Sequence, residues 1–350
     1  MKKLNLRAPL GTTDLTIPPI VFGTSYLGNL YTALSWERKL QIMQGWFDNV
    51  ASPVVIDTAG KYGAGLALEA IGKGLTELRI DPDDILISNK LGWIRTPLTG
   101  PEPTFEKGVW ADIKHDATHN FGYKGILECW EQGLELLGGN YNTPILSVHD
   151  PDEFVVTATN AKERAEKMDA VMESYHALLE LKQQGKADAI GIGSKDWRII
   201  REITNQIDLD WVMLAVSFTI MDHPSELIEW IEDLARKNVS VINSAVFHGG
   251  FLTGGDYYNY RIADRNSVSD KPLFAWRDRF FKICAEHKVK PSDACIKFGV
   301  SHQAIISIAL NTSRPEKVPG NIALIEKKIP DEFYRDMKDA GLIDPEYQYV

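Results

Sequence analysis

Four polar residues stand at or just after the ends of apolar runs, in a pattern that could support proton transfer: Asp57, Tyr62, Lys90 and His149. In VIDTAGKYGAG, Tyr62 stands five residues after Asp57. Lys90 ends the run DILISNK, and His149 ends the run PILSVH. If these runs are neighbouring strands, the four side chains converge on one spot, because adjacent strands lie only about 4.8 Å apart.

The chemistry of such a cluster follows from ordinary pKa values. A tyrosine with a pKa near 10 is a poor proton donor and a poorer base at neutral pH unless a cation stabilises its phenolate. Lys90 can be that cation, and Asp57 would keep it charged and aimed. His149 can hydrogen-bond a substrate oxygen. The cluster suits reversible interconversion of a carbonyl and an alcohol, for which a cofactor would have to carry the hydride.

Each residue also has an ordinary structural interpretation. Taken alone, Asp57 could cap a helix, Tyr62 could be a packed loop aromatic, and Lys90 a solvated surface lysine. His149 alone could be a buried histidine with satisfied hydrogen bonds. Their joint position at the carboxyl ends of consecutive strands favours a functional site over these interpretations, because burying such groups without a purpose is costly.

Eight short apolar runs are expected to be strands: IPPIVFGT, PVVIDTA, DILISNK, PILSVHD, ADAIGIGS, DWVMLAVSF, VSVINSAVF and AIISIALN. They are apolar nearly throughout, as in a parallel sheet covered on both faces. Amphipathic segments lie between them, such as 35–50 with Ser35 as its N-cap. This alternation predicts an α/β protein with a (β/α)8 TIM barrel as one domain over residues 1–350, rather than a doubly wound open sheet.

Two additions to the barrel are expected. The segment LNLRAPLGTTDLTIP predicts an N-terminal β-hairpin that could plug the bottom of the barrel. Residues 93–123, rich in Pro, Gly and aromatics, predict a long irregular loop after the third strand, rising from the catalytic face. No GxGxxG motif follows the first strand, and the glycines of GAGLALEAIGKG are more typical of close helix packing than of dinucleotide binding.

Composition narrows the partners and the compartment. The formal net charge of -10 and the absence of any basic cluster argue against nucleic-acid binding and favour a small-molecule partner. Three widely spaced cysteines, Cys129, Cys284 and Cys295, indicate reduced thiols. The N-terminus has no apolar run typical of a signal peptide, and no window is apolar enough for a membrane span. We expect a cytoplasmic protein; the sequence does not indicate its oligomeric state.

A metal site is the alternative from a different class of chemistry. In HDATH, His115 and His119 stand four residues apart with Asp116 between them, and a helix would put both imidazoles on one face. That arrangement would suit a metal-dependent barrel hydrolase. Against it, no third ligand stands at a strand end and no His-x-His follows the first strand, so we expect no metal.

In the order DTAGKYG, ISNK and SVHDPDE, the chain resembles the aldo-keto reductases, and further matches run from FGTSYLGNLY to RPEKVPGNIALI. Through FGTSYLGNLY, SVHDPD and YYNYR it is most similar to the branch of L-fucose and D-threo-aldose 1-dehydrogenases. The resemblance implies a (β/α)8 barrel, a nicotinamide cofactor extended across the strand ends, and direct hydride transfer without a metal. It makes Tyr62 the general acid/base, with Lys90 and Asp57 tuning it and His149 orienting the substrate.

The resemblance also implies cofactor contacts. Phe247 stands where an aromatic ring stacks on the nicotinamide, Ser313 and Arg314 near the adenosine 2'-phosphate, and Asn321 at the adenine. NADP(H) is therefore favoured and NAD(H) remains possible, since NTSRPEK reverses the usual Arg-Ser order.

A second difference from the family's usual sequence lies in the residues that hydrogen-bond the carboxamide of the nicotinamide. Ser194 and Lys195 replace the Ser-Asn pair that holds it in the family. If the Lys195 ammonium lies within about 6 Å of the ring, it would repel the oxidised ring by about 3 kcal/mol and so favour reduced cofactor. The alternative is that Lys195 points to solvent or to the pyrophosphate of the cofactor.

The expected reaction is oxidation of an aldose at C1 to the lactone, with the insertion 93–123 and DYYNYR contacting the sugar. The alternatives are a reductase of other aldehydes, including pyridoxal-like ones, the metal-dependent hydrolase, and a barrel that binds cofactor without catalysis.

Overall fold

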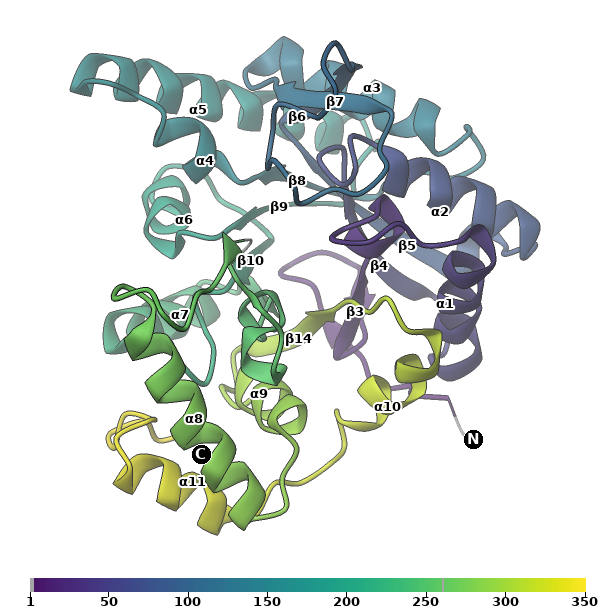
Figure 1. Ribbon diagram of the computed structural model, residues 1–350. Coiled ribbons are helices and arrows are strands. Elements are labelled where there is room, and N and C mark those ends of the chain that lie inside the picture. Colours follow the sequence, from purple (N-terminus) through teal and green to yellow (C-terminus); the bar gives the residue numbers. More distant parts are fainter. Residues whose placement is uncertain (1–2, 260) are drawn as a thin grey trace.

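Eight parallel strands close into a barrel at the centre of the computed structural model, which describes residues 3–259 and 261–350 (Figure 1). In ring order the strands run β10, β11, β14, β3, β4, β5, β8, β9. Their bounds are β3 Ile20–Gly23, β4 Val54–Ala59, β5 Ile85–Leu91, β8 Ile145–His149, β9 Ala189–Ser194, β10 Trp211–Ala215, β11 Ser240–Ser244 and β14 Ile305–Leu310. Each corresponds to one of the eight apolar runs, so the predicted (β/α)8 barrel is confirmed.

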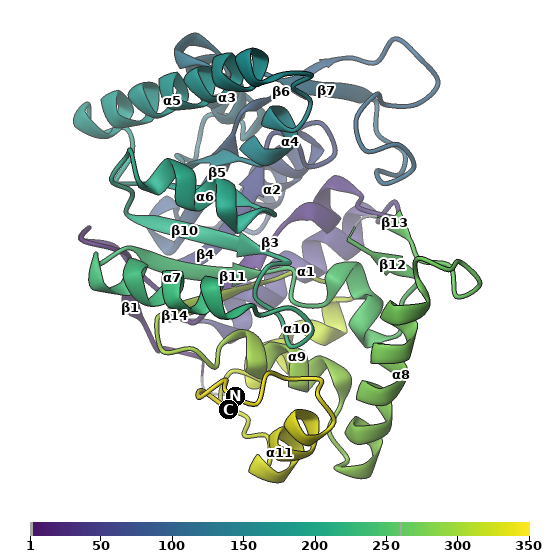
Figure 2. The ribbon, with the colours of Figure 1, turned by 90° about the vertical axis from the view of Figure 1, so that its left-hand side faces the viewer.

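Helices surround the barrel on its outside (Figures 1 and 2). They are α1 Trp36–Asn49, α2 Leu66–Glu77, α3 Tyr123–Leu136, α4 Pro151–Val155, α5 Ala161–Gln183, α6 Trp197–Thr204, α7 Ser225–Arg236, α8 Lys271–Glu286, α9 Pro291–Gly299, α10 Val318–Ala323 and α11 Asp331–Asp339. Short 3-10 turns are η1 Ser25–Gly28, η2 Pro82–Asp84, η3 His248–Thr253 and η4 Pro315–Lys317. Ser35 caps α1 as predicted, because its hydroxyl accepts a hydrogen bond from the backbone N–H of Arg38. No helix of the described part is long and apolar enough to cross a membrane.

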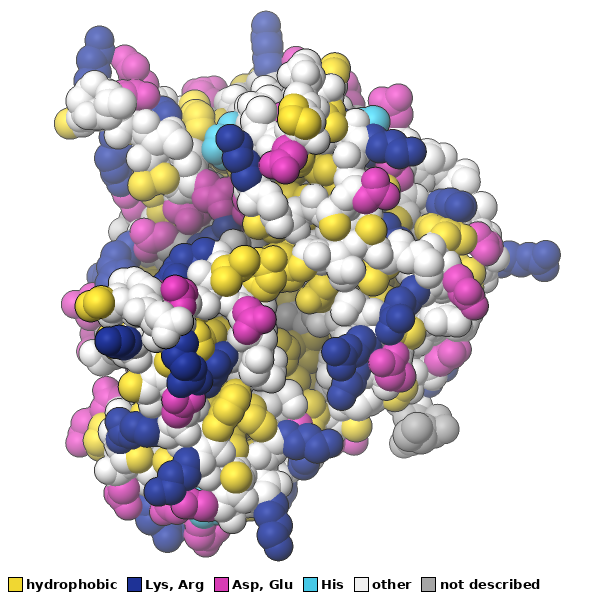
Figure 3. All heavy atoms as spheres, in the orientation of Figure 1, with side chains coloured by type: hydrophobic (Ala, Val, Ile, Leu, Met, Phe, Trp, Pro, Cys, Tyr) yellow, Lys and Arg dark blue, Asp and Glu magenta, His cyan; other side chains and the backbone are white. Residues whose placement is uncertain are grey.

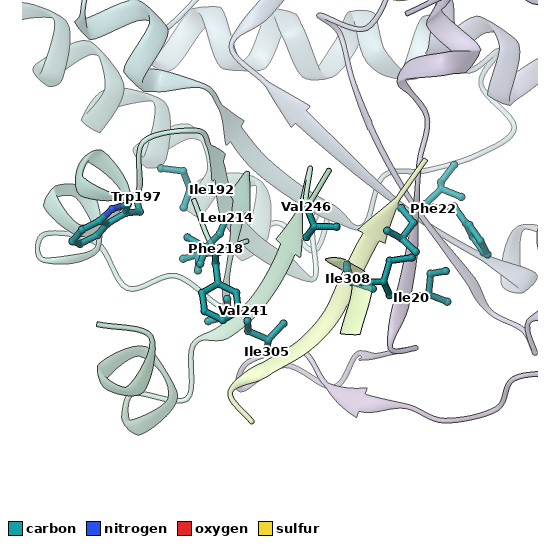
Figure 4. Packing of buried hydrophobic residues seen from close by; sticks show 14 of the residues in the cluster. Ile20, Phe22, Ile192, Trp197, Leu214, Phe218, Val241, Val246, Ile305 and Ile308 are labelled. Atoms are coloured by element: carbon teal, nitrogen blue, oxygen red, sulfur yellow. The ribbon is translucent and has the colours of Figure 1, made fainter. Parts of the chain in front are cut away.

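The strands bury side chains on both faces, as the unbroken apolar runs predict. Outward-facing residues pack under the helices (Figure 4); Phe22, for example, stacks on Trp46 of α1 with ring centroids 5.3 Å apart. Inward-facing residues such as Trp211 and Ile242 fill a second, smaller core inside the barrel.

The predicted N-terminal hairpin closes one end of this interior. Strands β1 (Ala8–Pro9) and β2 (Thr16–Ile17) pair antiparallel. Leu10 and Ile17 are buried in the same core as Trp211, and the Gly11 N–H donates to Ser240 Oγ at 2.7 Å. In the side view the hairpin lies at one end of the barrel, while the arms β6–β7 and β12–β13 lie at the other end (Figure 2). The open end of the barrel is therefore the end at which the strands have their carboxyl termini, and we call it the mouth.

The insertion after β5 is less irregular than predicted. It contains a two-stranded ladder, β6 (Trp93–Pro97) against β7 (His115–His119), with 98–114 as the irregular connection between the two strands. Trp93 and Ala117 bury their side chains in a local core with Phe105 and Trp110, which explains why these polar-looking ends are ordered as strands. A second arm, β12 (Tyr257–Tyr258) with β13 (Arg261–Ile262), rises after β11.

Candidate active site

Strand register brings the four predicted residues to one sector of the mouth. Lys90 lies opposite Ala59 of β4 on one side and Ser147 of β8 on the other. The Lys90 ammonium forms an ion pair with the carboxylate of Asp57, as predicted, and both side chains are buried. Its aliphatic stem runs against Gly193 of β9, where an added Cβ would lie 3.0 Å from Lys90 Cδ. A larger residue at position 193 would therefore press on the lysine.

Tyr62 lies in the loop after β4, directly over this pair. The Lys90 Nζ is 4.7 Å from the centroid of the phenol ring, and the His149 ring meets it edge-on at a centroid distance of 5.5 Å. The loop is set by a backbone contact with η1: a Cβ on Gly28 would lie 2.7 Å from the carbonyl carbon of Tyr62. Gly63, at φ 61°, would likewise place a Cβ 2.2 Å from the carbonyl oxygen of Gly28. Glycine is needed on both sides of this contact.

Burial is the largest influence on the pKa values of Asp57 and His149. Desolvation raises the pKa of Asp57, and the Lys90 ammonium and the Ser88 hydroxyl oppose that rise. Desolvation lowers the pKa of His149 well below its usual value, so the imidazole is neutral at physiological pH. Its Nδ1 is buried and has no hydrogen-bond partner among the residues that the structure describes. A neutral imidazole can donate one hydrogen bond to a substrate oxygen without adding charge.

A group of ion pairs, with Lys61 and Asp150 buried and the other members half-buried, adjoins the four residues, and sequence reasoning missed it. We call it the ion-pair cluster: Lys61, Lys195, Glu106, Asp150 and Glu153. Lys61 Nζ lies 2.9 Å from Glu106, 3.1 Å from Asp150 and 2.6 Å from Glu153. Lys195 pairs with the same three carboxylates, and the closest is Glu153. Acidic and basic side chains meet on this side of the mouth, next to α4 (Figure 3).

The ion pairs shift the pKa values of three members of the cluster, Lys61, Asp150 and Glu106, toward their charged forms. Burial by itself would lower the pKa of Lys61, but the neighbouring carboxylates, Asp150 first, outweigh it and raise that pKa. Burial would raise the pKa of Glu106, yet the ammonium groups of Lys61 and Lys195 lower it. Interactions with His149, Lys195 and Lys61 likewise outweigh burial and lower the pKa of Asp150. A weak signal was present in the sequence, because Lys61 directly precedes Tyr62 and Asp150 directly follows His149. When the loops bring Tyr62 and His149 together, these neighbours meet as well.

Lys195 is not an isolated charge in the structure. Its ammonium is 3.6 Å from both Glu106 and Asp150 and closer still to Glu153, so carboxylates offset its field. These carboxylates would weaken the predicted repulsion of an oxidised nicotinamide, which stays a prediction. The Ser194 hydroxyl, buried at the end of β9, donates to Asp152 Oδ1 at 2.5 Å. Burial and the nearby Asp150 raise the pKa of Asp152 to about 6.

The remaining predicted cofactor residues lie on the arc of strands that runs from β11 to β14. Phe247 is half-buried and follows β11, and Asn321 is half-buried in α10. Ser313 and Arg314 lie between β14 and η4; the guanidinium of Arg38, which sequence reasoning missed, donates to the carbonyl of Ser313 at 3.0 Å. Arg38 and Arg314 are both exposed. Two accessible guanidinium groups beside Ser313 form a donor set that fits the phosphate of a nucleotide.

The metal alternative does not survive the structure. HDATH forms strand β7, not a helix, and the Asp116 carboxylate accepts hydrogen bonds from the backbone N–H groups of Thr104 and Ala117. His119 packs its ring on Trp93 at a centroid distance of 3.9 Å, and burial lowers its pKa to about 4. Within residues 3–259 and 261–350, no three His, Cys, Asp or Glu side chains are grouped as a metal would need. Asp116 is therefore a structural residue of the insertion.

Comparisons with known proteins agree over nearly the whole chain. The model of the Aldo/keto reductase family matches residues 19–341. Pyridoxal 4-dehydrogenase of Microbacterium luteolum is 27% identical, over 97% of this chain and 99% of that protein. D-threo-aldose 1-dehydrogenase of Pseudomonas sp is 26% identical, over 94% of this chain and 95% of that protein. Among solved structures, the holo form of an aldo-keto reductase from Bacillus halodurans superimposes with a TM-score of 0.68 at 20% identity, covering 97% of this chain and 96% of that one.

Proposed function

This chain belongs to the aldo/keto reductase family, and from that premise we propose that it oxidises an aldose at C1 to the lactone with NADP+ as hydride acceptor. The observation that carries the proposal is the position of the Tyr62 ring above the Lys90–Asp57 ion pair and beside His149. A phenol next to an ammonium group can both give and take a proton at neutral pH, which carbonyl–alcohol interconversion requires.

The chain's own residues supply the proton chemistry and the orientation. When bound, the nicotinamide supplies the acceptor for the hydride that leaves C1. Tyr62 removes the proton from the C1 hydroxyl, and Lys90 lowers the free energy of the phenolate that performs this step. Asp57 holds the ammonium in place from below. The neutral imidazole of His149 donates a hydrogen bond to the substrate oxygen and so fixes the reacting carbon near the phenol.

A pyridoxal-like aldehyde is the second candidate. Pyridoxal 4-dehydrogenase has the higher identity of the two relatives compared, at 27% over 97% of this chain. The wall beside Tyr62 is also aromatic, since Trp93, Phe105 and Trp110 form a core on which Tyr62 packs. The two candidates share one chemical feature. An aldose and a pyridoxal with its neighbouring hydroxymethyl group both close to a cyclic hemiacetal, and oxidation of that ring carbon gives a lactone.

The preference for NADP(H) over NAD(H) is part of the proposal. Arg314 and Arg38 offer two exposed guanidinium groups next to Ser313, and a 2'-phosphate would satisfy both. NAD(H) lacks that phosphate and would leave the two cations without it.

A substrate panel tests the proposal directly. The purified protein is assayed with aldoses, pyridoxal and open-chain aromatic aldehydes, each with NADP+ or NAD+ for oxidation and the reduced forms for reduction. We expect turnover of cyclic hemiacetals, with a lactone identified by mass spectrometry. Activity confined to aldehydes that cannot cyclise would refute lactone formation, and no turnover of any carbonyl compound or hemiacetal would refute the proposed function.

A further inference from the structure

We propose that Glu106 is a positioning residue for the substrate: held by the buried ammonium of Lys61, it fixes the indole of Trp110 beside Tyr62 and thereby decides which substrates fit. The inference rests on the proposed carbonyl–alcohol chemistry at Tyr62. It gives the ion-pair cluster a role in selectivity, because Glu106 is the member of that cluster that the insertion contributes.

One carboxylate serves two donors. Oε1 of Glu106 lies 2.9 Å from Lys61 Nζ, and Oε2 accepts a hydrogen bond from Trp110 Nε1 at 2.8 Å. With both oxygens engaged, the carboxylate cannot rotate without losing one partner. The Trp110 ring in turn lies 6.0 Å from the Tyr62 ring, centroid to centroid, with 34° between their planes. The indole is therefore a wall of the site, and its angle depends on the glutamate.

A second attachment holds the same part of the insertion from its other side. Residues 109–111 pair antiparallel with 29–31, through the bridge between Leu30 and Trp110. The Tyr31 N–H donates to the Val109 carbonyl at 2.7 Å, and the Ala111 N–H donates to the Asn29 carbonyl at 3.0 Å. Backbone bonds on both sides of Trp110 restrict where its Cα can be, and the Glu106 carboxylate then restricts where the indole can point.

The backbone geometry indicates that these ion pairs hold the chain in place. Glu106 has φ 41° and Asp150 has φ 46°, both in the left-handed region that residues with a Cβ adopt at a cost. Both carboxylates reach the same ammonium, that of Lys61, which is only 2% exposed. Strained backbone positions persist where the surrounding contacts over-determine the conformation. Here the contact that the two strained residues share is the buried Lys61 ammonium.

The chain offers a substitution that separates positioning from folding. The cluster holds three carboxylates and two ammonium groups, so Glu106→Gln leaves both lysines with Asp150 and Glu153. The two donors face different oxygens of Glu106, and an amide replaces one of these oxygens with an NH2 group, so it cannot present an acceptor to both the Lys61 ammonium and the Trp110 N–H. The variant therefore keeps a paired cluster and breaks the connection that runs from Lys61 through residue 106 to the indole. Trp110→Phe breaks the same connection from the other end.

The kinetic experiment compares Glu106→Gln, Trp110→Phe and their double variant with Glu102→Gln, an exposed control in the same insertion. We expect kcat/KM for a ring-sized aldose or pyridoxal to fall about tenfold in both single variants, and that for a three-carbon aldehyde to change less than twofold. The Kd for NADPH should stay constant. The double variant should lose no more than either single variant, because both act through one contact. Equal losses on small and large substrates, or additive losses in the double variant, would overturn the proposal.

A measurement without catalysis keeps this test independent of the proposed function. Hydrogen exchange at the amides of Tyr31 and Ala111 reports the pairing of the insertion with 29–31. We expect at least fivefold faster exchange in Glu106→Gln than in wild type and no change in Glu102→Gln. If wild type turns over no carbonyl compound, the proposed function fails. The exchange rates of the Tyr31 and Ala111 amides still show whether Glu106 holds the insertion in place. Unchanged exchange in Glu106→Gln would overturn the positioning whatever the activity.

Discussion

The mouth of the barrel has two arcs of opposite character. On the arc formed by β4, β5 and β8, which we propose is catalytic and call the catalytic arc, the side chains of Asp57, Lys90 and His149 are buried, and Asp57 and Lys90 form an ion pair between neighbouring strands. On the arc after β14, which we propose binds the nucleotide and call the nucleotide arc, Arg314 is exposed and Ser313 is half-buried. Buried groups carry interactions that a low dielectric strengthens, whereas exposed ones are screened by water and salt. Substitutions on the catalytic arc should therefore act on kcat, and those on the nucleotide arc on cofactor affinity.

The largest effect is expected from Tyr62→Phe. The substitution keeps the ring and removes the hydroxyl that moves the proton, so kcat should fall by about 10²- to 10⁴-fold with little change in the Kd for NADPH. Steady-state kinetics with cofactor titration measures both. Near-normal turnover would mean that another group moves the proton and that Tyr62 is not the general acid/base.

Lys90→Met should lower kcat by about 10²-fold. Without the ammonium, the phenolate of Tyr62 is no longer stabilised, so the alkaline limb of the pH–rate profile should move up in pH. Because Asp57 is buried and would lose its partner, the double variant Asp57→Asn/Lys90→Met serves as the control for stability. A pH profile that keeps its alkaline limb in the residual activity would show that Lys90 does not tune the tyrosine.

Arg314→Leu should raise the Kd for NADPH about tenfold and leave the Kd for NADH within twofold. The side chain is exposed, so the loss should shrink as salt concentration rises. Fluorescence titration at two ionic strengths measures it, with Arg335→Leu, an exposed arginine of α11, as the matched control. If the Kd values for NADPH and NADH rose equally, the 2'-phosphate would lie elsewhere, and the proposed role of the nucleotide arc in recognising it would be wrong.

The smallest effect concerns Asp152, a half-buried carboxylate next to the catalytic arc whose hydrogen-bond donor is the Ser194 hydroxyl. Its pKa is about 6 in the folded chain against 3.8 as the ordinary value, so the folded protein takes up the proton more readily. The carboxylate therefore costs no stability below about pH 4, and its full cost appears above about pH 6. Asp152→Asn should add about 1 kcal/mol to the free energy of unfolding at pH 8.

That gain should shrink as the pH falls from 6 toward 4, and thermal melts at pH 8 and pH 5 measure it. A gain of equal size at both values would contradict the assigned pKa shift of Asp152. The same melts on Ser194→Ala would show how much of the effect depends on the hydroxyl that donates to this carboxylate.

The two arcs also differ in how far the sequence could predict them. Asp57, Lys90 and His149 could be found because each interrupts an apolar run near its end, and parallel register then fixes which side chains are neighbours. The Lys61–Glu106 contact could not be found this way. It joins a loop residue to an insertion whose path depends on its own aromatic core, and no periodicity encodes that path.

The ladder β6–β7 escaped prediction for a related reason. HDATH carries polar residues at most positions, so its strand character comes from the burial of Ala117 and from the pairing of Trp93 with His119. Lys195 was placed correctly after β9, but its carboxylate partners lie on other loops and were invisible in its own sequence neighbourhood. Charges on separate loops can be assigned to pairs only once the loops have been placed.

The N-terminal hairpin can complete its contacts with the barrel only after most of the chain has been synthesised. Its residues leave the ribosome before the strands of the barrel do, yet the hydrogen bond from Gly11 reaches Ser240, 229 positions later. At about 5–20 residues per second, the hairpin waits roughly ten to fifty seconds for that partner to be synthesised. During this interval Leu10 and Ile17, which the finished barrel buries, have no barrel interior to enter. The hairpin can therefore seal the barrel only after β11 has been synthesised. A chain that stops before β11 leaves Leu10 and Ile17 without their binding partners and open to contacts with other chains.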